Sequence, residues 1–258
     1  LHFKGAVILE AYGQTEVTAG ITATLPDDTE VGHVGALLPN CWVKLADVPE
    51  LEYYTADEQG EICVKGPCFP KGYFKEPEKT AELFDQQGWL HTGDIGMWTP
   101  RGTLKIIDRK KNILKLAQGE YVAPEKIENV YSRCPFVSQI FVDGRSLETY
   151  LVAIVVPNKE EIRQRIEKKH QFQFSVVEKY EDSRQFWTNE RLIAKVLEEM
   201  RSVGKKNGLN SLEQVKAIKF YYEESFTVEN GLLTPTFKLK RPQLKKKFVQ
   251  DIDDLYKI

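Results

Sequence analysis

The chain has 258 residues, 41% of them hydrophobic and 29% charged, which is enough to bury at least one sizeable core in one large domain or two smaller ones. Its 36 basic and 38 acidic residues leave a formal net charge of −2, a balance that argues against a nucleic-acid-binding protein. The four cysteines fit neither a metal-ligand spacing nor a disulfide framework, so we assign them no site and expect a reducing, cytosol-facing compartment. No apolar run approaches the roughly 18 to 20 residues that span a bilayer.

The first part of the chain, up to about residue 108, is predicted to be a β-rich subdomain. An apolar, strand-like run opens the segment GAVILEAYGQTE (5–16) and leads into a Gly turn and a polar loop. Short apolar or alternating runs follow, with Gly, Pro and Asp between them: WVKLADV (42–48), GEICVKG (60–66) and TLKIID (103–108). Short strands with this punctuation favour antiparallel pairing.

The remainder, from about residue 110, is predicted to be a smaller α+β domain. Pro124 suits the first turn of a helix, and Glu125 and Glu128 suit the N-terminal end of its dipole. The strand candidates are QIFVDG (139–144), YLVAIVVP (150–157) and VKAIKFYY (215–222), and the helix candidates are 158–170 and 190–208.

Two further signals lie near the C-terminus. SLEQ at 211–214 matches a capping-box pattern. The last segment carries an apolar stripe at helical spacing: Leu244, Phe248, Ile252 and Leu255 or Tyr256. The basic residues on or beside this predicted helix, Lys240, Arg241 and Lys245–Lys247, fit a solvated flank.

The segment AYGQTE (11–16) places a carboxylate after a hydroxyl at the end of a predicted strand, where open α/β sheets bind ligands. Glu16 beside Thr15 suits a Mg²⁺ ion that phosphates also hold, and Tyr12 can lie against a base ring. Taken alone, an ordinary polar turn is the simpler explanation.

Three other spots carry polar groups that strand and helix packing would not need. Asp94, after Gly93 in a predicted tight turn, can accept both hydroxyls of a ribose or can satisfy its own backbone in an Asx turn. Arg109 can reach a ribose or phosphate, and DRKKN (108–112) can link two domains, although a solvated charge run is the usual explanation. Lys238 follows a Pro-containing turn that can extend its ammonium into a cleft.

The order and spacing of these motifs resemble those of the adenylate-forming enzymes, specifically the long-chain acyl-CoA synthetases (fatty acid–CoA ligases). GWLHTGDIGMWTPRGTLKIIDRKKNILKLAQGEYVAPEKIENVY carries the resemblance, and AYGQTE and LTPTFKLKR are further matches. The resemblance covers essentially the whole chain and corresponds to the C-terminal part of that family. It implies an α/β and α+β fold, in which residues 1–109 are the β-rich end of the large AMP-binding domain and 110–258 are a small, mobile α+β domain.

The resemblance also implies roles for single residues in the large domain. It places Tyr12 against adenine, Thr15 against phosphate and Glu16 at Mg²⁺. Asp94 takes the ribose hydroxyls, with Arg109 beside it. The implied nucleotide-binding set is Tyr12, Gly13, Gln14, Thr15, Asp94, Arg109 and Lys238.

In the small domain, Lys238 matches the family's adenylation lysine, which stands between the substrate carboxylate and the α-phosphate. The implied catalytic residues are Lys238, Glu16 and Thr15. A hinge is implied at about residues 108–111, with Asp108 and Lys111. The resemblance places Lys115 and Gly119 on the face used in thioester formation, where a glycine allows close backbone approach of the pantetheine arm.

The activity implied for the full-length protein is the ATP-dependent conversion of long-chain fatty acids to acyl-CoA through an acyl-adenylate, with Mg²⁺ and with coenzyme A as a substrate. No nucleic-acid partner is implied. The family resemblance implies peripheral or anchored association with a cytosol-facing membrane, of the endoplasmic reticulum or the mitochondrial outer membrane.

The family's SGTTG-like phosphate loop, most of the acyl tunnel and the N-terminal membrane anchor are expected upstream of Leu1. We therefore expect this chain to be a C-terminal fragment that does not turn over in isolation. The alternative, from a different functional class, is a non-catalytic fragment or isoform that acts as a binding or scaffolding module.

Overall fold

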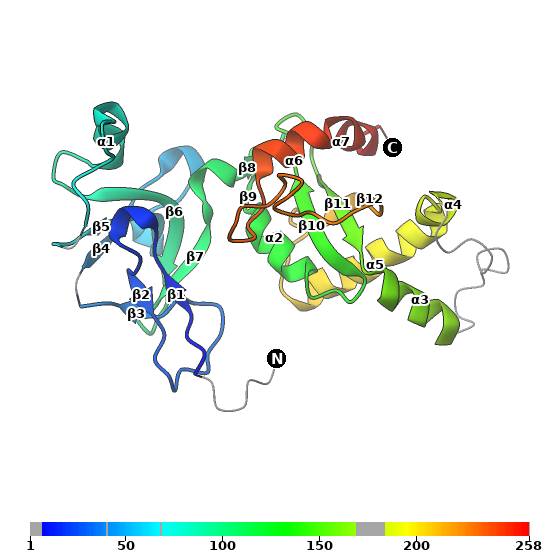
Figure 1. The fold of residues 1–258 in the computed structure, drawn as a ribbon, viewed down its shortest axis with the longest axis horizontal. Coiled ribbons are helices and arrows are strands. Elements are labelled where there is room, and N and C mark those ends of the chain that lie inside the picture. The colour runs from blue at the N-terminus through cyan, green and yellow to red at the C-terminus, as the bar shows by residue number, and fades with distance from the viewer. Residues whose placement is uncertain (1–6, 40, 68, 169–183, 258) are drawn as a thin grey trace. The chain divides into compact units, whose positions relative to one another are not determined.

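The computed structural model describes residues 7–39, 41–67, 69–168 and 184–257 (Figure 1). The chain divides into two compact units, Leu1–Ile113 and Leu114–Ile258. The boundary predicted from the sequence, between Arg109 and Lys110, lies four residues before this one. That the chain hinges at about residues 108–111 stays a prediction.

The first unit is built on two antiparallel sheets, of order β1-β2-β3 and β4-β5-β6-β7. The strands are β1 (Ala11–Tyr12), β2 (Thr22–Ala23), β3 (Ala36–Leu37), β4 (Trp42–Ala46), β5 (Gln59–Lys65), β6 (Leu90–Trp98) and β7 (Leu104–Arg109). The described part of this unit also contains the α-helix α1 (Pro77–Leu83) and the 3₁₀ turns η1 (Thr15–Val17), η2 (Pro49–Leu51), η3 (Thr55–Asp57) and η4 (Lys110–Asn112), the last of which follows β7. The predicted antiparallel β subdomain is confirmed.

Alternation along β5 explains how the larger sheet has one apolar and one polar face. Ile62 and Val64 are two residues apart, so they point to the same face, where they join Leu90 and Leu104 in the core. Glu61 and Cys63 point to the other face. Both side chains are buried nevertheless, so this face holds a carboxylate and a thiol away from solvent.

The apolar run that opens GAVILEAYGQTE forms less strand than its composition predicts. Among its described residues, 7–16, only Ala11–Tyr12 is a strand, paired with Thr22 and Ala23 of β2. Val7, Ile8 and Leu9 are exposed and lie outside any strand, because β-propensity alone does not supply a hydrogen-bonding neighbour.

The second unit combines a mixed sheet of order β10-β11-β12 with a small hairpin, β8-β9. The strands are β8 (Leu114–Lys115), β9 (Tyr121–Val122), β10 (Val137–Asp143), β11 (Leu151–Pro157) and β12 (Val215–Phe220). The helices are α2 (Pro124–Tyr131), α3 (Lys159–Lys168), α4 (Arg184–Trp187), α5 (Glu190–Lys206), α6 (Arg241–Lys247) and α7 (Val249–Leu255). The predicted strands and the helices that begin near Pro124, Lys159 and Glu190 are therefore confirmed.

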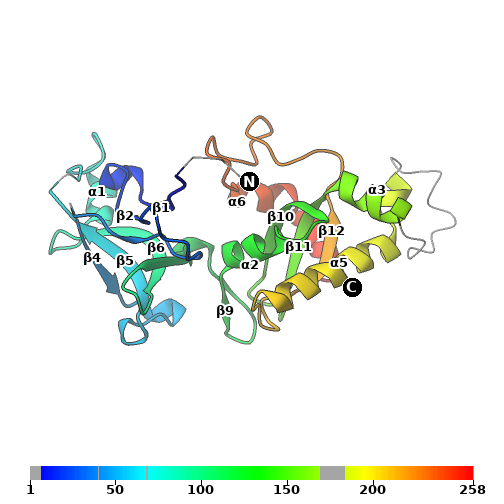
Figure 2. The same ribbon diagram turned by 90° about the horizontal axis from the view of Figure 1, so that it is seen from below.

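Each face of the mixed sheet has its own core, as Figure 2 shows with α5 and α6 on opposite sides. Alternate residues of β11 serve the two cores: Leu151, Ala153 and Val155 pack with α2 and α5, whereas Val152, Ile154 and Val156 pack with α6 and α7. Every residue of β11 is buried, which is why its sequence is a continuous apolar run and does not alternate.

Three sequence predictions for this unit need correction. SLEQ does not act as a capping box; instead the Asn210 side chain accepts hydrogen bonds from the amides of Leu212 and Glu213, while Glu213 accepts one from the Asn210 amide. This reciprocal arrangement starts one residue earlier and leads into β12, with no helix. The terminal amphipathic segment is two short helices, which separate at Phe248.

The third correction concerns Arg241, which was predicted to be a solvated charge. Its side chain is buried and ion-paired with Glu128, so the composition of the basic run hid one structural residue among surface lysines.

Within the described residues, no helix is long and apolar enough to cross a membrane. Cys41, Cys63 and Cys134 are buried and unpaired, and Cys68 lies outside the described residues.

Candidate functional site

Asp94 lies at the centre of a three-residue cluster in the first unit. The hydroxyl of Tyr12, 82 positions away, donates a hydrogen bond to Asp94 Oδ2 at 2.7 Å. Arg109 Nε lies 3.2 Å from Asp94 Oδ1, because Asp94 of β6 and Arg109 of β7 are direct cross-strand partners. The structure thus brings together three of the residues that the sequence predicted to bind the nucleotide.

Asp94 was predicted to lie in a tight turn between two elements. That prediction is wrong, because Asp94 lies inside β6. There the pairing with β5 shifts: Cys63 pairs with His91, and the next pair is Glu61 with Ile95. Residues 92–94 therefore face a single residue of β5 and form a bulge. Gly93 has φ +71°, a conformation that glycine adopts without strain. Bulges redirect side chains, and this one sets the direction of Asp94.

Burial makes the phenol of Tyr12 a firm hydrogen-bond donor. Desolvation, followed by the negative charge of Asp94, raises the pKa of Tyr12 far above its ordinary value. The hydroxyl therefore stays protonated at any physiological pH and can donate to Asp94. The aromatic ring of Tyr12 remains the part that a base could stack against.

The loop that follows Tyr12 requires glycine at its first position, Gly13. A Cβ at position 13 would lie 1.4 Å from the carbonyl oxygen of Ala19. The carbonyl of Gln14 accepts hydrogen bonds from the amides of Val17 and Ala19, and that of Thr15 accepts one from Thr18. These bonds fold residues 14–19 into a compact loop that holds the Thr15 side chain in an exposed position.

Glu16 is the candidate metal ligand of this loop. The Tyr73 hydroxyl donates to its Oε1 at 2.6 Å, and within the described residues Oε2 has no hydrogen-bond partner. No group of three or more His, Cys, Asp or Glu side chains that could hold a metal ion occurs in the described part of the chain. Glu16 thus fits one ligand of an ion whose other ligands come from a bound phosphate chain and water, the usual way in which Mg²⁺ is held.

The segment predicted to be a hinge begins in the sheet and leaves it as a 3₁₀ turn. Asp108 is almost fully buried and its Oδ1 accepts a hydrogen bond from the Arg109 amide at 2.6 Å. Lys110 forms ion pairs with Glu50 at 2.9 Å and with Glu61 at 3.6 Å. Lys111 is exposed.

Lys115 and Gly119 lie on the β8-β9 hairpin of the second unit. Lys115 pairs across the hairpin with Tyr121, and its Nζ lies 5.0 Å from the centroid of that ring. Gly119 has φ +93° in the connecting loop, and no atom lies within 4 Å of where a Cβ would stand. A backbone that is open on this side can be approached closely by a ligand.

Lys238 follows the tip of a closed turn, as predicted. Leu233 and Leu239 pair as an isolated bridge at its base. The Thr234 amide donates to the Lys238 carbonyl at 2.8 Å, and the Lys238 amide donates to Thr234 Oγ1 at 3.0 Å. The side chain of Lys238 is exposed, and its ammonium has no ion-pair or hydrogen-bond partner among the described residues. Hydrogen bonds thus fix the backbone of the turn, while within the described residues the Lys238 ammonium is not neutralised by a carboxylate.

Sequence reasoning missed two residues that shape these sites. Arg241 pairs with Glu128, 113 positions away, and also donates to the Val142 carbonyl, which fixes α6 directly after the Lys238 turn. Glu61 contacts both the Asp94 bulge and Lys110. The sequence offered one signal for these contacts. The carboxylates of Glu61 and Glu128 both stand among buried apolar residues, where a charge requires a partner.

Two family models match the chain. The model described as AMP-binding enzyme matches residues 2–74, and the model described as AMP-binding enzyme C-terminal domain matches residues 126–184. Long-chain-fatty-acid–CoA ligase 6 of Homo sapiens is 53% identical over 98% of this chain, which covers 35% of that protein. The chain therefore spans about a third of the length of the curated relatives that it matches.

Solved structures give the same picture. The adenylation domain of a carboxylate reductase from Mycobacterium chelonae matches with a TM-score of 0.79 and 35% identity, over 97% of this chain and 35% of that one. The corresponding domain from Segniliparus rugosus, in complex with AMP and a co-purified carboxylic acid, matches with a TM-score of 0.79 and 32% identity, over 96% and 35%. The chain belongs to the AMP-binding enzymes, and its fold is that of their adenylation domains. Within that family it is similar to the long-chain-fatty-acid–CoA ligases.

Proposed function

We propose that the full-length protein containing this chain is an ATP-dependent long-chain fatty acid–CoA ligase. The chain supplies the β-rich end of its AMP-binding domain and its small C-terminal domain, with a hinge at Asp108–Lys111. The observation that carries the proposal is the Asp94 cluster. A carboxylate that Tyr12 and Arg109 hold at a strand bulge is built to accept the two hydroxyls of a ribose.

In the first step, a fatty-acid carboxylate oxygen attacks the α-phosphorus of ATP. The bond to the β-phosphate oxygen breaks, pyrophosphate leaves, and an acyl-adenylate remains. Two anions must approach each other, so a fixed cation lowers the barrier. Lys238 is suited to this role because its ammonium is exposed and has no partner in the described structure.

The residues around the phosphates have supporting roles in this step. Thr15, exposed on its loop, offers a hydroxyl to a phosphate oxygen, and Gly13 and Gln14 shape that loop. Glu16 would hold Mg²⁺ through the carboxylate oxygen that Tyr73 does not engage. When bound, such an ion supplies charge neutralisation at the phosphates.

In the second step, the sulfur of coenzyme A attacks the acyl carbon, its thiol proton passes to solvent, and AMP leaves with the electron pair of the broken carbon–oxygen bond. Lys238 has no further task at the phosphate. A rotation at the hinge would replace it with the β8-β9 hairpin, where the open side of Gly119 admits the pantetheine arm and Lys115 adds a positive charge.

We extend the proposal to location from the resemblance to the long-chain acyl-CoA synthetases and from the substrate class in the relatives' names, long-chain fatty acids. A long-chain fatty acid partitions into bilayers, so an enzyme that activates it gains from contact with a membrane. A cytosol-facing membrane, of the endoplasmic reticulum or the mitochondrial outer membrane, is the proposed site. Contact through a region outside this chain is the simplest route.

The test is fatty-acid-dependent exchange of radiolabel between pyrophosphate and ATP, measured on the full-length protein. Lys238→Ala should lower the exchange rate by about 10²–10³, or roughly 3–4 kcal/mol, the usual loss for one electrostatic donor. The matched control is Lys246→Ala, which removes an exposed lysine of the same basic run and should leave exchange intact. If wild-type protein shows no exchange, the non-catalytic binding module replaces this proposal.

A further inference from the structure

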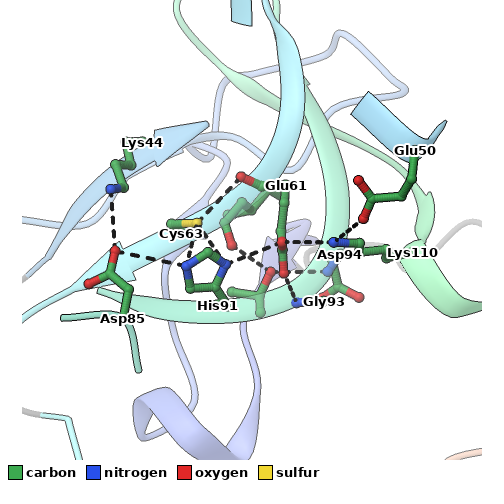
Figure 3. A network of polar contacts seen from close by, with 11 residues as sticks. Lys44, Glu50, Glu61, Cys63, Asp85, His91, Gly93, Asp94 and Lys110 are labelled. Carbon is green, nitrogen blue, oxygen red and sulfur yellow. Dashed lines mark hydrogen bonds and ion pairs between the residues drawn. The ribbon is translucent and has the colours of Figure 1, made fainter. Parts of the chain in front are cut away.

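A network of charged and polar side chains covers the face of the larger sheet opposite its apolar core (Figure 3). Lys44 of β4, Cys63 of β5 and His91 of β6 form one row, because they are consecutive cross-strand partners. His91 lies 3.2 Å from Glu61 and 3.8 Å from Asp85, which in turn lies 3.6 Å from Lys44. The row is thus bounded by two carboxylates.

The thiol in this row is not set up for covalent chemistry. Cys63 Sγ lies 3.5 Å from His91 Nδ1, an arrangement that superficially matches an activated nucleophile. However, Cys63 is fully buried, and desolvation, followed by the charge of Glu61, raises its pKa to about 12. The thiol therefore stays protonated and inaccessible, and the network has to be explained by what it holds in place.

Glu61 is the member of the network that contacts the proposed nucleotide site. It is 7% exposed. Its Oε1 accepts a hydrogen bond from the Gly93 amide at 3.2 Å, at the bulge that directs Asp94. Its Oε2 lies 3.2 Å from His91 Nδ1 and 3.6 Å from Lys110 Nζ.

These contacts connect both sides of the Asp94–Arg109 pair. Gly93 precedes Asp94 on β6, and Lys110 follows Arg109 at the end of β7. Bulge amides have lost their ladder partners, and a nearly buried carboxylate is a strong acceptor for one of them. Removing Glu61 would leave the Gly93 amide without this partner and the segment after Arg109 without its inner ion pair.

We propose that Glu61 is a positioning residue for the ribose site: it holds the Gly93 bulge and Lys110, and thereby fixes the direction of Asp94 and Arg109. Glu61 itself touches no substrate. The inference rests on the proposed function, since it assigns Asp94 to the ribose hydroxyls.

The test uses full-length protein and measures pyrophosphate exchange with ATP, 2′-deoxy-ATP and 3′-deoxy-ATP. In wild type, loss of a hydroxyl that a carboxylate accepts should lower kcat/KM by about tenfold or more. In Glu61→Ala, kcat/KM for ATP should already be about tenfold lower, through KM, and the further penalty for a deoxynucleotide should shrink to about threefold or less. KM for the fatty acid should not change.

Two further variants separate positioning from general damage. Glu61→Gln keeps the size of the side chain and an acceptor for the Gly93 amide, so it should fall between wild type and Glu61→Ala and keeps the test available if the alanine variant does not fold. Glu50→Gln removes the outer, exposed partner of Lys110 and should leave the deoxynucleotide penalty at its wild-type value.

The possible results decide the matter. A smaller deoxynucleotide penalty in the Glu61 variants supports positioning, because reduced stability alone would lower activity with all three nucleotides equally. If the penalty stays at the wild-type value in both Glu61 variants, the role of Glu61 is refuted while the proposed function stands. If wild-type protein has no exchange activity, the proposed function fails and this inference fails with it.

Discussion

The bulge around Asp94 and the turn around Lys238 present their functional side chains in opposite ways. Asp94 is 5% exposed, and both of its carboxylate oxygens are already engaged, by Tyr12 and Arg109. Lys238 is exposed, and its ammonium is without a partner in the described structure. In the Lys238 turn it is the backbone that is fixed, because Arg241, just after the turn, is buried and ion-paired with Glu128.

The difference fits the role that we propose for each group. A group that selects a ligand by geometry gains from being held before the ligand arrives, since the cost of ordering it has been met during folding. A cation that must neutralise a phosphate would lose that ability if a carboxylate of the protein already neutralised it. The following experiments separate these two designs, from the largest expected effect to the smallest.

The largest effect is expected at the base of the Lys238 turn. Arg241→Met should destabilise the second unit by about 3–5 kcal/mol, because it leaves the buried carboxylate of Glu128 without its counter-charge. Urea unfolding followed by tryptophan fluorescence, to which Trp187 in the core of this unit contributes, measures the change.

The double variant Arg241→Met with Glu128→Gln provides the control, because the amide removes the charge and can still accept the hydrogen bond of the Val142 amide. It should recover most of the lost stability. A double variant as unstable as the single one would show that packing of α6, and not an unpaired charge, is what Arg241 provides.

The bulge should respond through nucleotide affinity. Asp94→Asn keeps the shape of the side chain but removes its charge, and we expect KM for ATP in the exchange reaction to rise by about 10- to 100-fold, the range for hydrogen bonds to a charged group. Unfolding midpoints should change little. An unchanged KM for ATP would contradict the proposal that Asp94 binds the ribose, and with it the contrast between Asp94 and Lys238.

A smaller effect is expected on the β8-β9 hairpin. Gly119→Ala places a Cβ at φ +93°, where strain costs roughly 1 kcal/mol, and puts a methyl group on the side proposed for the pantetheine arm. Acyl-CoA formation should fall several-fold while pyrophosphate exchange stays constant. Gly208→Ala has comparable strain at φ +80° and equally open space, so a similar loss in that variant would rule out a local effect.

The smallest effect concerns a surface pair that neither site uses. Hydrogen bonds from Lys247, then from Tyr221 and Asn230, lower the pKa of Glu224 from 4.5 to about 2. Because the folded-state pKa is depressed, the stabilisation is complete above about pH 4.5 and is lost as the pH falls towards 2. The stability difference between wild type and Glu224→Gln should shrink over that interval; a constant difference would contradict this assignment.

The sequence predicted the elements that depend on local periodicity and missed the features that depend on distant partners. The apolar run of β11 and the stripe of Leu244, Phe248 and Ile252 could be read directly, because burial leaves its period in the sequence. The break at Phe248 could not be predicted, since the same stripe would suit one continuous helix.

The candidate site divides in the same way. Motif order made Asp94 and Lys238 candidate site residues, which they remain, but it suggested a turn where β6 is bulged. The bulge depends on a register shift against β5 and on the side chain of Glu61, which is 32 positions from Gly93. Likewise, no local pattern distinguishes Arg241 from the lysines around it, because its partner lies on α2.

The two-sided core of the second unit has a kinetic consequence. The Lys238 turn and the Gly119 hairpin are attached to one unit whose central strand is buried on both faces, so neither loop can be displaced far without disturbing shared packing. A probe on either loop should therefore report the same relaxation time, in the microsecond-to-millisecond range of domain motions. The proposed exchange of the Lys238 turn for the Gly119 hairpin between the two half-reactions would then be a single conformational step with a single rate constant.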